Sequence, residues 1–152
     1  MKILDVLTKD TISIDLKATD KKGVLKELAA PAAKVAGATP EELVKILLER
    51  ERLGSTGIGG GIGIPHGKLK HLDQLVLGFG LSRRGVDYES IDRRPTHIFF
   101  LLLTPEDSAG LHLKVLARIS RLLKNDDLKA QLMRAASPDE ILEIIRDKDE
   151  EF

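Results

Sequence analysis

The chain has 152 residues, of which 42% are hydrophobic and 32% charged, so it is long enough to enclose one substantial core. Its 24 basic and 24 acidic residues leave a formal net charge of zero, which disfavours nucleic acid and anionic membranes as partners. The absence of cysteine excludes disulfides, thiol catalysis and cysteine-ligated metal sites.

The sequence predicts neither a membrane span nor a second domain. The longest apolar run, Ile98 to Leu103, is too short to cross a bilayer, and Asp5 and Asp10 interrupt the apolar residues at the N-terminus. No internal repeat or linker stands out. We therefore expect a single domain over residues 1–152, located in the cytoplasm and without membrane insertion.

The N-terminal third is predicted to contain a short strand followed by two helices. Residues Ile12 to Leu16 favour a strand, and residues Lys21 to Ala36 favour a helix that Pro31 should kink. Thr39 is suited to cap a second helix, because its hydroxyl can accept a hydrogen bond from a free backbone N–H. That helix is predicted to be amphipathic and to run from Pro40 to about Arg52.

The middle of the chain is predicted to consist mainly of strands. Ile58 to Ile64, Gln74 to Ser82 and Thr96 to Thr104 are short runs rich in Ile, Val, Leu and Phe. Residues Ile98 to Leu103 are apolar at every position, a pattern typical of a central strand that is covered on both faces. Helices should therefore pack on both sides of the sheet.

The C-terminal third is predicted to be helical. Thr104-Pro105 and Ser137-Pro138 each combine a capping hydroxyl with proline at the first helical position, so both indicate helix starts. Helices are expected at Leu111 to Leu123 and at Pro138 to Arg146. The complete pattern predicts the α/β class, as a three-layer sandwich with a mixed central β-sheet and helices on both faces.

A glycine-dense segment, Leu53 to Lys68, places His66 between a proline and a glycine. Glycine reaches positive φ and allows another molecule to approach closely, at an entropic cost that structure alone rarely requires. The segment fails the Walker pattern, because Ile62 stands where a glycine is needed and Leu69 where a hydroxyl is needed. It also fails the dinucleotide fingerprint. We therefore expect His66 itself to carry chemistry.

A neutral imidazole is a nucleophile near pH 7, because its ordinary pKa is about 6.5. If the electrophile is a phosphoryl group, catalysis requires positioning and hydrogen-bond donors around its oxygens. Arg50 extends an apolar helix stripe toward the loop, and His112 lies on an apolar helix face near the helix start. The loop supplies further candidate contacts to the phosphoryl group: Ser55, Thr56 and Gly67.

The supporting residues also have structural interpretations. A histidine on an apolar helix face, such as His112, is often a packing residue, and Arg50 can extend past its helix end to solvent. His71 and His97 lack the paired spacing of metal ligands, so we expect neither a metal ion nor a cofactor.

The segments from Leu53 to Gly59 and from Ile64 to Lys68 resemble the active-site signature of a known family. This is the EIIA domain of the fructose/mannitol class in the bacterial phosphoenolpyruvate:sugar phosphotransferase system. The similarity extends over nearly the whole chain, including Leu101 to Glu106 and His112 to Leu116. The resemblance implies that His66 accepts a phosphoryl group from the phosphohistidine of HPr or its nitrogen-branch paralogue. It also implies supporting roles for His112 and Arg50.

Within this family, the chain is similar to the stand-alone nitrogen-regulatory branch, which implies a regulatory output that acts on a kinase or transporter. One alternative is a sugar-transport EIIA that passes its phosphoryl group to an EIIB cysteine. Another is a non-catalytic regulatory binding module. The chain departs from the branch at Gly60, Gly63 and Arg93, where the branch often has asparagine, alanine and glycine, respectively.

Overall fold

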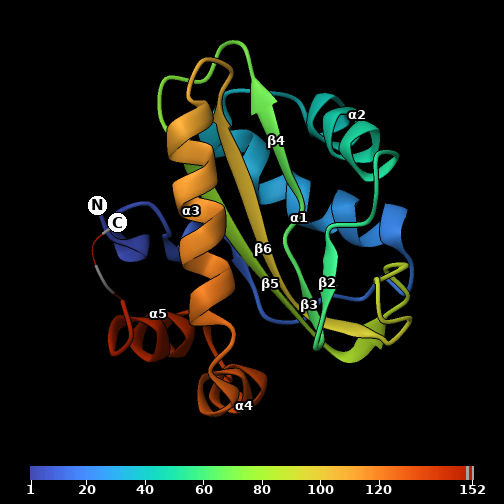
Figure 1. Cartoon of the computed structure of the whole chain (residues 1–152), viewed down its shortest axis with the longest axis vertical. Coiled ribbons are helices and arrows are strands. Elements are labelled where there is room, and N and C mark those ends of the chain that lie inside the picture. The colour runs from blue at the N-terminus through green and yellow to red at the C-terminus, as the bar shows by residue number, and fades with distance from the viewer. Residues whose placement is uncertain (150, 152) are drawn as a thin grey trace.

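A six-stranded mixed β-sheet lies between two layers of helices, with α3 crossing in front of the sheet in Figure 1 and α1 behind it. The structure is a computed structural model that describes residues 1–149 and 151. The strands are β1 (Ile12–Ser13), β2 (Gly57–Gly59), β3 (Ile62–Gly63), β4 (His66–Leu69), β5 (Val76–Val86) and β6 (Thr96–Pro105). The helices are α1 (Lys21–Ala36), α2 (Pro40–Glu51), α3 (Ala109–Leu122), α4 (Asp126–Arg134) and α5 (Pro138–Arg146), with short 3-10 turns at Ile3–Asp5 and Lys9–Thr11.

The central strand β6 packs against both helical layers. Its odd-numbered residues from Phe99 to Leu103 join the core formed with α1 and α2. Its even-numbered residues from Ile98 to Leu102 join the core formed with α3, α4 and α5. Each leucine or phenylalanine buried in this way contributes about 1.5–3 kcal/mol. The predicted three-layer α/β sandwich is confirmed.

Strands β3 and β4 form one interrupted strand beside β6. Both run parallel to β6, pairing Ile62 with Ile98 and His66 with Leu102. Between them, Pro65 has no N–H to donate, although its carbonyl oxygen accepts a hydrogen bond from the N–H of Leu102. His66 is therefore the first residue of the resumed strand, next to the centre of the sheet.

The first two long helices begin and end as the sequence predicts. The Thr39 hydroxyl accepts a hydrogen bond from the N–H of Glu42 at the start of α2. Helix α1 continues through Pro31 and is followed by Gly37, whose φ of 67° lies in the left-handed region. None of the helices in the described part of the chain is long and apolar enough to cross a membrane.

Three predicted elements differ from the structure. Residues predicted as one strand, Ile58 to Ile64, form the β2–β3 hairpin instead, because positive φ angles at Gly59 through Gly61 reverse the chain. Thr104 does not begin a helix, since β6 pairs with β4 through Pro105 and α3 starts only after Ser108. The strand predicted at Ile12 to Leu16 is limited to two residues.

Helix α4 was absent from the sequence prediction. Its start is capped by Asn125, whose side chain accepts a hydrogen bond from the N–H of Leu128. Leu128 and Leu132 bury its apolar face against the sheet, so α4 extends the layer formed by α3 and α5. Only nine residues long, the helix depends on this packing for its stability.

Candidate functional site

Both ring nitrogens of His66 have hydrogen-bond partners that define the tautomer. Nδ1 lies 2.8 Å from the carbonyl oxygen of Ile64, and a carbonyl can only accept, so Nδ1 carries the proton. Nε2 lies 3.2 Å from Nε of Arg50, which can only donate. Nε2 therefore holds the unshared electron pair, and it is the ring atom able to act as a nucleophile.

Arg50 reaches His66 from the last turn of α2. Leu43 and Leu47 bury the apolar face of this helix, and Arg50 follows on the same side, one turn beyond Leu47. Its Nη1 donates to the carbonyl oxygen of Gly54 at 2.9 Å, which leaves Nε directed at His66. A cation at the C-terminal end of a helix is also favoured by the helix dipole.

The contact between α2 and β4 depends on a glycine. A Cβ added at Gly67 would lie 2.6 Å from Cγ2 of Ile46. This distance is shorter than any ordinary contact, so only glycine allows the helix and the strand to approach so closely. Arg50 on α2 and His66 on β4 are within hydrogen-bond distance as a result.

His112 forms the other side of the site. Its ring centroid lies 5.1 Å from that of His66, with the rings at 65° to each other. Its Nδ1 is 2.7 Å from the hydroxyl oxygen of Thr104, which orients the ring from the adjacent end of β6. The side chain belongs to the first turns of α3, and the residue is 7% exposed.

The surroundings keep both imidazoles neutral near pH 7. Burial lowers the pKa of His66 below its ordinary value, and Arg50 lowers it further, while the hydrogen bond to Ile64 and the charge of Glu51 act in the opposite direction. Burial, followed by electrostatic interactions with His66, Lys68 and Arg50, lowers the pKa of His112 to about 4. No proton therefore has to leave Nε2 for that atom to be available as a nucleophile.

These residues open into a cleft of about 420 Å³. Its lining consists of Ile46, Glu49, Arg50, Leu53, His66, Gly67, Lys68 and His112. Arg50 and Lys68 provide positive charge beside His66, which suits an anionic group. A larger groove of about 760 Å³ lies on α1 and α2, but its lining includes neither of these histidines. Within residues 1–149 and 151, no group of His, Asp or Glu side chains is arranged to hold a metal ion.

The structure brings together most of the residues proposed from the sequence. His66, His112, Arg50 and Gly67 all line the cleft. The Ser55 hydroxyl instead donates to the Tyr88 carbonyl oxygen and accepts from the N–H of Gly57. The Thr56 hydroxyl is buried against Glu51 and Tyr88. Neither Ser55 nor Thr56 is among the residues that line the cleft, and the hydrogen bonds of both hydroxyls hold the loop.

Sequence reasoning missed two residues next to the site. Thr104 is predicted both to end the strand from Thr96 and to cap a helix, and neither prediction gives it a role at the site. Glu51 received no role, yet a carboxylate in the last turn of a helix is disfavoured by the helix dipole. Its position there was the signal that a specific partner holds it.

The three departures from the nitrogen-regulatory pattern have structural explanations. Gly60 has a φ of 66°, in the left-handed region that asparagine also tolerates, so both residues fit this turn. A Cβ at Gly63 would lie 3.1 Å from the Phe99 ring, so alanine there requires a small shift. Arg93 has a φ of 60°, a conformation that glycine adopts without strain.

Comparison with known proteins identifies the family. Residues 5–148 match the family model of the phosphoenolpyruvate-dependent sugar phosphotransferase system, EIIA 2. The chain is 40% identical over 145 residues to a nitrogen regulatory protein of Bradyrhizobium diazoefficiens, covering 95% of each chain. It is 38% identical over 150 residues to the fructose-specific EIIABC component of Bacillus subtilis, covering 98% of this chain but only 24% of that longer protein.

A solved structure agrees with this assignment. The crystal structure of the nitrogen regulatory protein IIA-Ntr from Neisseria meningitidis matches with a TM-score of 0.88 at 29% identity, covering 93% of this chain and 97% of that one. The chain belongs to the EIIA 2 family of the phosphoenolpyruvate-dependent sugar phosphotransferase system.

Proposed function

We propose that Nε2 of His66 accepts a phosphoryl group from the phosphohistidine of an HPr-type protein. The observation that carries this proposal is the tautomer of His66. The Ile64 carbonyl holds the ring proton on Nδ1, and Nε2 keeps its electron pair beside Arg50 in an open cleft. The family assignment supports a phosphotransfer role for the chain.

In the proposed step, the electron pair on Nε2 attacks the phosphorus atom of the donor. A new N–P bond forms at His66 while the N–P bond of the donor breaks, and the electron pair of the broken bond remains on the donor imidazole. Nδ1 keeps its proton and its hydrogen bond to Ile64 throughout. The reaction therefore needs no separate general base.

Three groups are placed to stabilise the phosphoryl oxygens in this step. Arg50 must release Nε2 before the attack, and its guanidinium is then free to donate to those oxygens. His112 occupies the opposite side of the cleft, and the backbone of Gly67 lies beside the acceptor ring. Donors that the site supplies stabilise the charge on these oxygens in the transition state and so reduce the barrier.

Exposed apolar side chains next to the cleft are suited to contact a protein donor. Leu53 lines the cleft and is 84% exposed, and Leu113, which follows His112 on α3, is 67% exposed. Large apolar side chains that remain in water beside a reactive group favour docking of a protein surface. We expect this exchange to occur in the cytoplasm.

We infer a regulatory output in which the phosphorylation state of His66 controls binding to a kinase or transporter. Similarity to nitrogen regulatory proteins from two organisms supports this output. The similarity to the fructose-specific EIIABC component of Bacillus subtilis favours a second candidate, transfer of the phosphoryl group to a cysteine of an EIIB domain. Incubation of the phosphorylated chain with an EIIB domain distinguishes the two, because only the second predicts a phosphocysteine product.

The acceptor role is tested by incubating the chain with phosphoenolpyruvate, enzyme I and HPr. The wild type should gain an acid-labile phosphoryl group, and His66→Ala should gain none. A wild type that takes up no label, or label that survives His66→Ala, contradicts the proposal. His71→Ala is the matched control, because His71 is not among the residues that line the cleft.

A further inference from the structure

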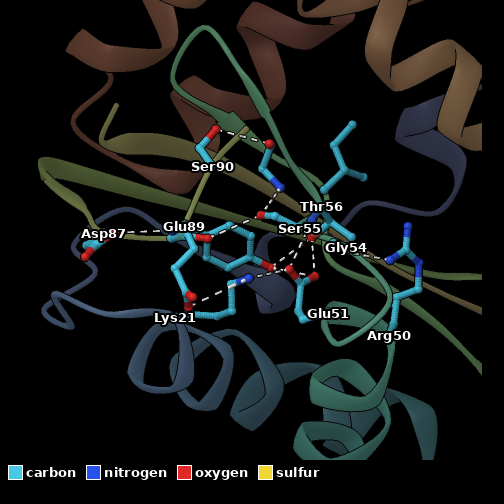
Figure 2. Close-up of polar contacts among 12 residues, drawn as sticks. Lys21, Arg50, Glu51, Gly54, Ser55, Thr56, Asp87, Glu89 and Ser90 are labelled. Carbon is cyan, nitrogen blue, oxygen red and sulfur yellow. Dashed lines mark hydrogen bonds and ion pairs between the residues drawn. The ribbon is translucent and has the colours of Figure 1, made fainter. Parts of the chain in front are cut away.

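Glu51 is a buried carboxylate in the last turn of α2, with a side chain that is 4% exposed. Each of its oxygens has two donors (Figure 2): Oε1 accepts from the Thr56 N–H at 3.0 Å and pairs with the Lys21 ammonium at 2.9 Å. Oε2 accepts from the hydroxyls of Thr56 and Tyr88. Burial and the charge of Glu51 raise the pKa of Tyr88, so its phenol remains a donor. A buried carboxylate is stable only with such complete compensation.

One path of hydrogen bonds leads from Glu51 to Nδ1 of His66. Glu51 holds both the N–H and the hydroxyl of Thr56. The carbonyl oxygen of Thr56 accepts from the N–H of Ile64 at 3.0 Å. The carbonyl oxygen of Ile64 in turn accepts from Nδ1 of His66 at 2.8 Å. The position of the group that selects the tautomer therefore depends on Thr56.

A second path leads to Nε2 of the same ring. Gly54 precedes Thr56 by two residues in the loop that Glu51 holds, and its carbonyl oxygen accepts from Nη1 of Arg50 at 2.9 Å, as Figure 2 shows. The same guanidinium donates from Nε to Nε2 of His66. Both ring nitrogens are thus held by groups whose positions depend on one short loop.

We propose that Glu51 is a positioning residue for phosphoryl acceptance, one that fixes the orientation and tautomer of His66 through the loop at residues 54–56. This inference rests on the proposed function of His66. Glu51 itself is buried away from the cleft and contacts neither the ring nor the incoming group. Without it, the Ile64 carbonyl and Arg50 would lose their fixed positions. The ring would then also populate the tautomer with the proton on Nε2, in which that atom has no unshared electron pair and cannot attack phosphorus.

The test compares Glu51→Gln with wild type by two measurements. Nitrogen NMR of the labelled histidines, recorded without any phosphate donor, reports which nitrogen of His66 carries the proton. Stopped reactions with excess phosphorylated HPr report the rate of acceptance. We expect Glu51→Gln to show a mixture of tautomers, a lower pKa of His66 because the raising effect of Glu51 is lost, and acceptance slowed about tenfold.

Glu27→Gln is the matched control. Glu27 also holds backbone N–H groups, those of Lys17 and Ala18, but it does so on α1, away from the cleft. This variant should change neither the tautomer of His66 nor the rate. If Glu51→Gln does not fold, Thr56→Val serves instead, because it removes one donor to Glu51 while nearly preserving the side-chain volume. Thr56→Val should shift the tautomer of His66 and slow acceptance in the same direction as Glu51→Gln, but by less.

The outcomes are distinct. A folded variant with the wild-type tautomer overturns the proposal, whether or not its rate falls, because a slower rate alone indicates general loss of structure. A mixed tautomer with an unchanged rate also overturns it. A wild type that accepts no phosphoryl group ends the proposed function, and the nitrogen spectra of the variants then decide on their own whether Glu51 positions the ring.

Discussion

Nε of Arg50 lies 3.2 Å from Nε2 of His66, so a cation donates a hydrogen bond to the nitrogen that carries the unshared pair. This contact keeps the ring unprotonated and places the guanidinium beside the point where phosphoryl oxygens would arrive. It also occupies the nucleophile, so the arginine must change partner from ring to phosphoryl group during the reaction. Arg50 is therefore expected to affect the rate more than the fold.

Replacing Arg50 by alanine should slow acceptance from phosphorylated HPr by about tenfold or more, because one preorganised donor contributes a few kcal/mol to transition-state stabilisation. Arg50→Lys should be slowed as well, since an ammonium cannot hold the Gly54 carbonyl and His66 in the same fork geometry. Arg52→Ala, at the end of the same helix and outside the cleft, is the control. Equal rates for Arg50→Ala and wild type would rule out this role.

The lowered pKa of His66 has a consequence for the pH profile. The nucleophile is the unprotonated ring, so acceptance should be constant above about pH 6.5 and should fall only under more acidic conditions. An NMR titration of the free protein should place His66 below the ordinary histidine value and His112 near 4. A short unfolded peptide containing histidine provides the reference. A His66 midpoint at or above that of the peptide contradicts the electrostatic description of the site.

Gly67→Ala should damage both stability and activity. The added Cβ would lie 2.6 Å from Cγ2 of Ile46, so α2 must shift away from β4. Overpacking of this kind costs about 1–3 kcal/mol of unfolding free energy, and the shift also moves Arg50 relative to His66. The measurement is urea unfolding combined with the acceptance rate.

Gly110→Ala is the control for that substitution. A Cβ at Gly110 meets nothing within 4 Å, and alanine is the better helix former by up to about 1 kcal/mol. This variant should be as stable as the wild type or more so. If Gly67→Ala were equally stable, the close approach of α2 to β4 would not require glycine.

Arg93→Gly should stabilise the protein. Arg93 has a φ of 60°, and an L-residue in this region is strained by about 1–2 kcal/mol. Glycine removes the strain but costs about 0.5–1 kcal/mol of additional chain entropy, so we expect a net gain of about 0.5–1 kcal/mol in urea unfolding. The neighbouring Arg94 lies outside the left-handed region, so Arg94→Gly relieves no strain and should lower stability. A loss of stability in both variants would contradict the proposed backbone strain at Arg93.

Sequence patterns were sufficient for the parts of the fold that depend on local chemistry or on continuous apolar runs. The Thr39 and Ser137 caps, the buried strand around Phe100 and the layers on both faces all follow from such patterns. Thr104 shows the limit. Its Thr-Pro sequence satisfies the rule for a helix start, yet pairing with Lys68 on a distant strand keeps it in the sheet. The sequence places Thr104 both at the end of a strand and at a helix start, and only the pairing in the folded chain decides between the two.

Some residues of the candidate site could likewise be predicted from local patterns, and others could not. Local glycine and helix patterns, together with the family resemblance, indicated His66, Arg50 and His112, and the structure places them around one cleft. The role of Glu51 depends on Lys21 and Tyr88, which lie 30 and 37 positions away in the sequence and meet it only in the folded chain. No spacing rule connects such residues, so the signal in the sequence is limited to a carboxylate in the last turn of a predicted helix.

The central claim is that Nε2 of His66 is the acceptor atom. Phosphorus and nitrogen NMR of the histidine-labelled chain, after reaction with phosphoenolpyruvate, enzyme I and HPr, tests it most directly. One N–P coupling is expected, at Nε2 of His66, with Nδ1 still protonated and hydrogen-bonded to the Ile64 carbonyl. A phosphoryl group on Nδ1, on another residue or on none would contradict it.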